Sequence, residues 1–504
     1  MANSNRRLKC IVPSLGQYNQ DEDIFYKMRQ SISGRLSRTI DVREPKSQKP
    51  NNQHRPTLIY LLIGLLSLIL VGALLLMLPV SSQSGNATDF ITALYTSTSA
   101  VCVTGLVVVD TGTYWSGFGQ FIIFILFQLG GLGFMTSATL IIAIFLGKNI
   151  SLSERLRFRR ANLQGAGLDA TTGRMGKFEL RSLIMNVVKL TLLIEFIGIS
   201  CILLVQFFGG QTLNMDFIWR TIFTAVSAFT NAGFDIEGNF QSLIGLQSQP
   251  FTLIVLAVLV LFGATGYSIW IDVLYKKKWH NFMVDTKIVL ASSFSFIILG
   301  AVALLISEYS SGVLSTMSNV QAIFISIINS IFVRTAGFSI IEYDQIPDQL
   351  LYLFSGLMFI GGASGSCAGG IKLTTFIILG YAIIASVRGQ DYINVNRTEI
   401  PWRFVHQGLS IALLSLGLVF ITIFVLSATL EANFMHIVFE AISAFSTNGT
   451  TTGITRSLNV VGEITSILTM FIGRIGPLTL ALILAERFER KQVMRYPEGE
   501  IAIG

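Results

Sequence analysis

Four short segments of the chain share a pattern of small and polar residues that ends in glycine. They are Ser99–Gly105 (SAVCVTG), Ser227–Gly233 (SAFTNAG), Ser330–Gly337 (SIFVRTAG) and Ser443–Gly449 (SAFSTNG). The four glycines lie 128, 104 and 112 residues apart, so the pattern repeats on the scale of a structural unit. Backbone carbonyls of such loops can replace the water shell of a cation. The repeat therefore predicts four loops that meet around one axis and hold a cation between them.

Glycine suits this role because it adopts backbone angles that can aim successive carbonyls in one direction. One such glycine alone is more often a turn or a helix-packing residue, whereas four in register favour the ion-binding interpretation. We expect the last three residues of each segment to line the ion path: Val103, Thr104, Gly105, Asn231, Ala232, Gly233, Thr335, Ala336, Gly337, Thr447, Asn448 and Gly449.

A second unusual segment is the glycine-rich stretch 361–370, which interrupts an apolar run at about 350–387. It contains five glycines in ten residues, and each costs a helix about 1 kcal/mol relative to alanine. The composition predicts a broken helix whose flexible intramembrane loop acts as a gate; a simple helix kink is the alternative. The spacing of Gly365 and Gly370 resembles a phosphate-binding loop, but no Lys-Ser/Thr pair follows.

Arg474 lies inside an apolar run, where a charge is expensive and indicates a functional or paired residue. We expect it to be a functional residue of the gate. The alternative is a static contact with helix-end carbonyls. The complete set of expected gate residues is Gly361, Gly362, Ser364, Gly365, Ser366, Gly369, Gly370, Lys372 and Arg474.

The composition is that of a membrane protein, with 52% hydrophobic and only 13% charged residues, whereas soluble domains carry about 25% charged residues. Eight apolar runs are candidate spans of roughly 20 residues. A shorter segment separates the two runs of each pair and leads into a glycine loop. These segments predict an all-α polytopic membrane protein, with four tandem helix–pore helix–filter–helix units around one pseudo-fourfold pore and eight transmembrane helices. The short segments are at about 89–101, 216–229, 318–332 and 433–446.

The predicted boundaries follow from these runs and from the charges between them. Basic clusters and acidic stretches alternate along the chain, which by the positive-inside rule places both termini in the cytoplasm. The expected parts are a basic cytoplasmic tail 1–56, repeats at 57–147, 183–275, 285–387 and 403–488, and a C-terminal tail 489–504.

Three motifs, together with the fourfold repeat, resemble the Ktr/Trk/HKT superfamily of potassium-translocating membrane subunits. They are Arg334–Phe338 (RTAGF), the loop from Gly361 to Lys372, and Phe471–Leu478 (FIGRIGPL). Eight spans resemble the bacterial Ktr branch (KtrB-like), although the 56-residue N-terminal extension is longer than that branch suggests. The resemblance implies a plasma-membrane potassium channel that is not an enzyme, with potassium at the filter as its only metal.

The same resemblance implies selectivity for potassium when all four filter positions are glycine, as they are here. It also implies a homodimer, stimulation by sodium, and a separate cytoplasmic ring-forming regulatory subunit (KtrA-like). The arginine of the family motif that matches Arg474 faces the pore beneath the filter, so we expect Arg474 to oppose cation passage and to donate hydrogen bonds to carbonyls of the gate loop. ATP or ADP is expected on that partner, and no cofactor on this chain.

Two other functions compete with this interpretation. A proton- or sodium-coupled secondary transporter would use broken helices around a midplane site, and the broken 350–387 run and Glu195 within the 183–208 run fit it. An intramembrane enzyme would need clustered acids, histidines or a nucleophile. The scattered polar residues of the apolar runs supply no such cluster.

Overall fold

The computed structural model describes residues 55–149, 177–210, 214–309, 312–315, 317–390, 392–395 and 398–476. The chain divides into two units, Met1–Pro56 and Thr57–Gly504, and the fold described below is that of the second unit. The predicted C-terminal tail and nearly all of the predicted N-terminal tail lie outside the described residues.

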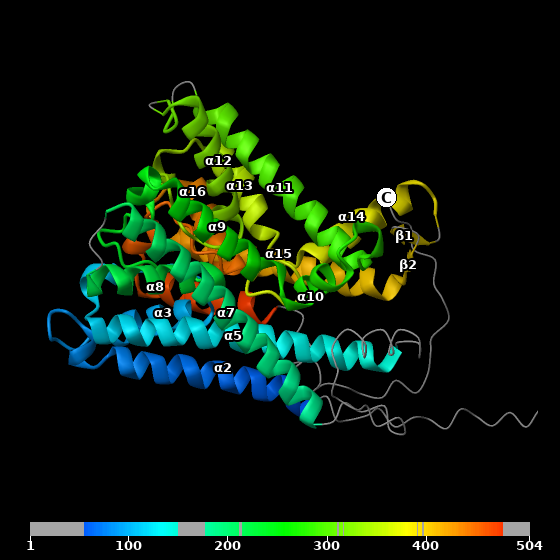
Figure 1. Cartoon of the computed structure of the whole chain (residues 1–504), viewed down its shortest axis with the longest axis horizontal. Helices are drawn as coiled ribbons and strands as arrows, with labels where there is room; N and C mark the ends of the chain where they lie inside the picture. The colour runs from blue at the N-terminus through cyan, green and yellow to red at the C-terminus, as the bar shows by residue number, and fades with distance from the viewer. Residues whose placement is uncertain are drawn as a thin grey trace, which may run out of the picture. The chain divides into compact units, whose positions relative to one another are not determined.

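The described part of the chain is almost entirely helical (Figure 1). A two-stranded antiparallel hairpin pairs β1 (Ile393–Val395) with β2 (Thr398–Ile400). The helices that flank the four short segments are α2 (Arg55–Leu76), α5 (Gly117–Asn149), α7 (Lys177–Phe208), α9 (Pro250–Thr265), α10 (Tyr267–Lys276), α11 (Val284–Glu308), α13 (Asp348–Phe359), α14 (Leu373–Val387), α15 (Trp402–Thr429) and α17 (Val460–Ile475). The remaining α-helices are α3 (Phe90–Val101), α4 (Thr111–Tyr114), α8 (Met215–Thr230), α12 (Asn319–Thr335) and α16 (Phe434–Ser446).

Among the described residues, three helices are long and apolar enough to cross a membrane: Met185–Phe208, Val284–Glu308 and Trp402–Thr429. A fourth candidate is the pair α9 and α10, which are bent by 100° relative to each other. The apolar run at about 250–275, one of the eight candidate spans, is therefore not one continuous helix. The chain turns at Gly266, whose φ of +81° ends α9 in a conformation that favours glycine. The count of eight crossings stays a prediction.

The helices α3, α8, α12 and α16 coincide with the four short segments expected from the sequence. Three of them begin at a side-chain cap: Asp89 accepts from Ile91 N, Ser318 from Gln321 N, and Asn433 from Met435 N. Each helix is more exposed at its start and buried at its end, and each ends at one of the glycine segments. The sequence of each short helix therefore directs one glycine segment into the interior.

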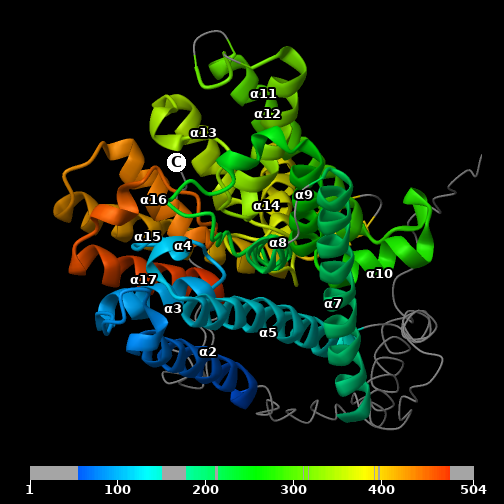
Figure 2. The same cartoon turned by 60° about the vertical axis from the view of Figure 1, so that its left-hand side comes forward.

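The packing of these short helices is cyclic. α5 packs against α8, α9 against α12, and α13 against α16. The last pair closes the circle, because α17 packs against α3. Figure 2 shows α17 (red) beside α3 (blue), although the two are far apart in sequence. Four successive parts of the chain thus surround one centre, where the four glycine segments lie.

Candidate functional site

The four glycines that end the repeated segments form one closed ring. A Cβ atom added to Gly105 would lie 2.4 Å from the carbonyl oxygen of Ala232, and one added to Gly233 would lie 2.6 Å from that of Ala336. A Cβ atom added to Gly337 would lie 2.0 Å from the carbonyl oxygen of Asn448, and one added to Gly449 would lie 2.0 Å from that of Thr104. Each glycine therefore faces the backbone of the next segment, and the fourth faces the first.

All four ring glycines have positive φ values: 90° at Gly105, 68° at Gly233, 76° at Gly337 and 100° at Gly449. L-residues rarely adopt these angles, so a side chain at any of these positions would be strained as well as crowded. The ring thus requires glycine for two independent reasons, its backbone angle and its close contact with the neighbouring segment.

Three of the four segments share one turn geometry. The residues two positions before the glycine, Val103, Asn231 and Thr447, have left-handed backbone angles with φ of 57°, 57° and 48°. The following amide in each segment donates to the carbonyl of the serine that opens it, as in Thr104 N to Ser99 O at 2.8 Å. These turns place backbone at the ends of the short helices, whose partial negative charge favours a cation.

The third segment reaches the same ring by a different turn. α12 continues through Thr335, and both Ala336 N and Gly337 N donate to Phe332 O at 2.9 and 3.2 Å. This difference follows from its sequence, because Ser330 lies seven residues before its glycine whereas the other three serines lie six residues before theirs. The additional residue of the third segment extends helix α12.

The glycine-rich stretch forms a loop whose two ends are hydrogen-bonded together. Ile360 and Ile371 form a parallel bridge, with Gly361 N donating to Ile371 O at 2.9 Å. Leu373 N, where α14 begins, donates to Gly362 O at 3.1 Å. The apolar run 350–387 is thus divided into α13, this loop and α14.

The loop is attached to the end of α9. Its amides at Ala363 and Cys367 donate to the carbonyl oxygens of Ala264 and Gly263, at 3.0 and 3.1 Å. The last carbonyls of a helix have no partner within the helix. Because α9 turns away at Gly266, these carbonyls are free to bind the loop.

Arg474 and Lys372 hold the loop from two sides. The Arg474 guanidinium is 1% exposed and donates to Cys367 O and, at 3.4 Å, to Gly130 O on α5. Lys372 Nζ donates to Ala368 O at 2.6 Å. Two cationic side chains therefore bind carbonyls of the same short loop.

The loop lies directly against the fourth glycine segment. A Cβ atom added to Gly369 would lie 2.2 Å from Thr447 Oγ1 and 2.6 Å from Ser446 O. The two serines predicted as gate residues bond locally instead: Ser364 Oγ is 3.1 Å from Thr374 Oγ1, and Ser366 Oγ donates to Ala363 O at 2.7 Å. The predicted ring residues and gate residues thus form one continuous site.

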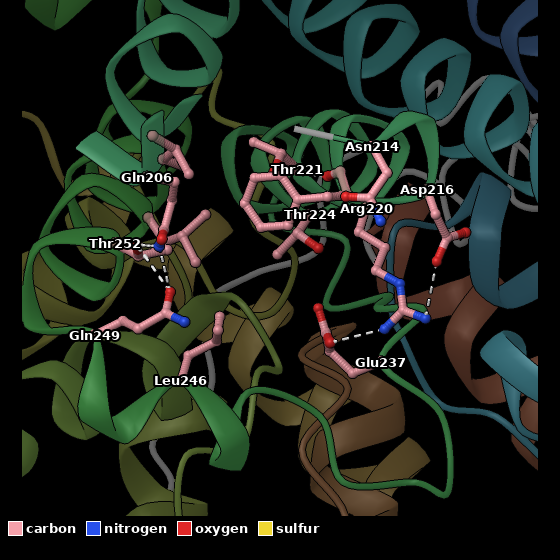
Figure 3. A pocket seen from close by; sticks show the side chains of 13 residues that line it. Gln206, Asn214, Asp216, Arg220, Thr221, Thr224, Glu237, Leu246, Gln249 and Thr252 are labelled. Carbon is pink, nitrogen blue, oxygen red and sulfur yellow. Dashed lines mark hydrogen bonds and ion pairs between the residues drawn. The ribbon is translucent and has the colours of Figure 1, made fainter. Parts of the chain in front are cut away.

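A polar cavity of about 390 Å³ lies near the second glycine segment, between α7, α8 and α9 (Figure 3). Arg220 of α8 points toward two carboxylates there, Asp216 at 3.4 Å and Glu237 at 3.3 Å. Glu237 follows Gly233 by four residues, so this partly exposed ion pair connects the second loop to its short helix. The opposite wall holds Gln206, Gln249 and Thr252.

Three glycines outside the predicted filter and gate residues also allow the ring to form. Cβ atoms at Gly130, Gly263 and Gly473 would lie 1.8–2.1 Å from carbonyl oxygens of Val101, Phe229 and Phe445, each four residues before a ring glycine. A repeated signal was present, because each of these glycines begins a Gly-x-x-Gly spacing and follows a ring glycine by 24 to 30 residues.

Two buried carboxylates lie near this site. Glu195 on α7 is 3% exposed and accepts hydrogen bonds from Gln128 Nε2 at 3.1 and 3.0 Å. Glu440 on α16 is fully buried behind the fourth glycine loop. Only Glu195 was singled out from the sequence, because Glu440 lies in a short segment with no other charge to mark it.

The comparisons with known proteins agree on one protein family. Residues 65–496 match the TrkH family, described as cation transport protein. The Ktr system potassium uptake protein B of Bacillus subtilis (strain 168) is 36% identical over 446 residues, which are 88% of this chain and 96% of that protein. The potassium/sodium uptake protein NtpJ of Enterococcus hirae is 34% identical over 449 residues, again 88% of this chain and 96% of that protein.

A solved structure, the potassium transporter TrkH from Vibrio parahaemolyticus, superposes with a TM-score of 0.67 at 17% identity. The match covers 89% of this chain and 88% of that one, and at this identity it concerns the fold alone. The family match over most of the chain, the long apolar helices and the curated relatives all agree. The chain is a multi-pass membrane protein and belongs to the TrkH family of cation transport proteins.

Proposed function

We propose that this protein takes up potassium across the plasma membrane through the ring formed by Gly105, Gly233, Gly337 and Gly449. The observation that carries the proposal is the closed contact of these glycines, each against the backbone of the next segment. Such a ring puts carbonyl oxygens from four sides around one axis, as ion coordination by backbone requires. The names of the curated relatives, which are potassium uptake proteins, support the choice of potassium.

In this proposal the four short helices act as pore helices. The last three residues of each glycine segment, which end at the ring glycine, act as the selectivity filter. Four helix–pore helix–filter–helix units would then surround the pore, with eight crossings and both termini in the cytoplasm. The cyclic packing that ends with α17 against α3 supports this arrangement. Ions would move down their electrochemical gradient, driven by about 2.3 kcal/mol per charge for each 100 mV of membrane potential.

The loop 361–370 is proposed as the gate. It is packed against Thr447 of the fourth filter segment and is bound through carbonyls by Arg474 and Lys372. The positive charge of Arg474 beside the ion path would oppose potassium while the loop is in place. Opening would require the loop to leave the end of α9.

Control of the gate is proposed to come from a separate cytoplasmic, nucleotide-binding subunit, since three of the relatives are named as parts of a Ktr system. A homodimer of this chain and stimulation by sodium belong to the same proposal. The test is potassium-dependent growth of a bacterial host that lacks its own potassium uptake, first with this chain alone and then with a KtrA-like partner. Absence of growth in both cases, with the protein present in the membrane, would contradict the proposal.

An ion-coupled transporter is the second candidate, because one relative is named as a potassium/sodium uptake protein. The buried pair of Glu195 and Gln128 would be the coupling site. Purified protein in liposomes separates the two functions. Saturable potassium flux without movement of protons or sodium supports the channel, whereas flux that stops when the second ion is withheld supports the transporter.

A further inference from the structure

Glu440 on α16 is a completely buried carboxylate that binds the loop following the fourth ring glycine. It is 0% exposed. Its Oε2 accepts a hydrogen bond from Thr451 Oγ1 at 2.7 Å, and its Oε1 accepts one from Thr455 Oγ1. A buried carboxylate is strongly unfavourable unless hydrogen bonds satisfy it. The two threonine contacts therefore stabilise Glu440 in its buried position.

These contacts extend to the backbone of the loop. Thr451 and Thr455 hydroxyl oxygens lie 2.9 Å apart, and Gly453 N donates to Thr451 Oγ1 at 3.0 Å. The two threonines follow Gly449 by two and six residues. One side chain of the short helix thus holds the segment through which the chain leaves the ring.

Hydrogen bonds join the first three loops to each other, whereas the fourth loop contacts the second through Arg456, whose guanidinium lies 4.3 Å from the centroid of the Phe240 ring. Phe240 N donates to Asp110 Oδ1 at 2.9 Å, which joins the second loop to the first. Leu243 N donates to Ser339 O at 3.0 Å, which joins the second loop to the third. Within the described part of the chain, no backbone hydrogen bond joins residues 447–459 to those loops. Glu440 thus supplies two hydrogen bonds that attach the outer half of the fourth loop to its own short helix.

The third loop has a neutral counterpart of this contact. Asn329 of α12 accepts a hydrogen bond from Tyr343 Oη at 2.9 Å, and Tyr343 follows its ring glycine by six residues, as Thr455 does. The second loop uses the Arg220–Glu237 pair, whose side chains are 40% and 30% exposed. The fourth loop is the one in which a fully buried charge has this role.

We propose that Glu440 is a positioning residue that fixes the fourth glycine loop and thereby determines discrimination between potassium and sodium at the ring. This inference rests on the proposed function. Carbonyls from four sides can favour the larger ion only while their spacing is maintained, because a contracting ring would accommodate sodium. Loss of the two threonine contacts releases one of the four sides.

The experiment compares potassium uptake, and its inhibition by sodium, for Glu440→Gln, Thr455→Val and Thr455→Ser in the uptake-deficient host. Glutamine keeps the shape of Glu440 but provides only one acceptor oxygen in place of two. We expect Glu440→Gln and Thr455→Val to lower the potassium preference roughly tenfold, equivalent to about 1.4 kcal/mol, and Thr455→Ser to preserve it. Glu431→Gln is the matched control, because Glu431 is exposed and precedes the same helix.

The outcomes are distinguishable from a failure of the proposed function and from a folding defect. If the unaltered protein transports no potassium, the proposed function fails before any variant is compared. Because selectivity is a ratio, a variant that only lowers protein abundance leaves it unchanged. Unchanged selectivity in both Thr455→Val and the double variant Thr451→Val/Thr455→Val, which retain the carboxylate, overturns the role of Glu440 even if Glu440→Gln does not fold.

Discussion

The Arg474 guanidinium donates a hydrogen bond to the carbonyl oxygen of Cys367. The two residues are 107 positions apart, and the contact joins the end of α17 to the middle of the loop that lies against Thr447 of the ring. The same guanidinium reaches Gly130 O on α5 at 3.4 Å. One side chain therefore connects the loop to two helices from opposite ends of the chain.

We expect Arg474→Ala to increase potassium flux. The substitution removes a positive charge beside the proposed ion path and a hydrogen bond to the loop. A hydrogen bond to a charged group contributes about 1.5–3 kcal/mol, so the ratio of open to closed protein should rise roughly tenfold or more. Rubidium uptake at equal surface abundance measures this.

Lysine is the control at this position. Arg474→Lys keeps the charge but not the geometry that reaches both Cys367 O and Gly130 O. We expect its flux to lie between those of the alanine variant and the unaltered protein. Unchanged or lower flux in Arg474→Ala would count against a role in gating and favour a purely structural contact.

Removal of residues 364–368 should leave the protein leaky to potassium. The deletion removes the amide of Cys367 and its hydrogen bond to Gly263 O, and it shortens the segment packed against the ring. We expect uptake to become independent of the regulatory subunit. A two-residue insertion after Gln390, which is exposed in the turn beyond α14, is the control and should retain regulation. A deletion variant that still needs its regulator would refute the gate.

The sequence was sufficient to predict the ring and the interrupted run, because both depend on local properties. Four glycine segments at long, similar spacings imply a shared environment, and five glycines in ten residues cannot continue a helix. The bend at Gly266 could not be predicted in the same way. The run 250–275 is mostly apolar and contains only two glycines, Gly263 and Gly266, whereas its break is stabilised by a loop about 100 residues later, which binds the carbonyls of Gly263 and Ala264.

Glu440 was missed for a related physical reason. Its partners Thr451 and Thr455 follow it by 11 and 15 residues, and the helix that carries Glu440 ends before either of them, at Ser446. Only the turn through Gly449 brings the threonine hydroxyls back to the carboxylate. Contacts across such a turn depend on tertiary geometry, whereas the glycine requirement is visible in each segment by itself.

Alanine at Gly337 should abolish potassium uptake. Its Cβ would lie 2.0 Å from Asn448 O, on backbone with φ of 76°, so both the steric contact and the left-handed conformation oppose it. We expect at least about a tenfold loss of uptake with the protein still in the membrane. Gly417→Ala is the control, since nothing lies within 4 Å of its Cβ position. Equal uptake by both variants would show that the ring is not in the ion path.

Potassium uptake should weaken as the external pH falls from 8 to 6, and Asp235 is the reason. Asp235 lies two residues beyond Gly233, and burial raises the pKa of its carboxyl to about 7. The hydrogen bond from Glu237 N lowers this pKa, whereas the nearby carboxylates of Glu237 and Asp110 raise it further. Because the pKa is raised, the carboxyl is mostly charged at pH 8 and mostly protonated at pH 6. Protonation removes a negative charge that attracts cations to the ring, so the KM for potassium should rise about two- to fivefold.

Asp235→Asn provides the test of this assignment. The asparagine variant should show the higher KM at every pH and lose the dependence between pH 6 and 8, because no proton can bind there. Potassium uptake measured over a range of external concentrations at pH 6, 7 and 8 gives the KM values. An asparagine variant that keeps the pH dependence of the unaltered protein would assign the titration to another group, and it would remove Asp235 from the path by which ions enter.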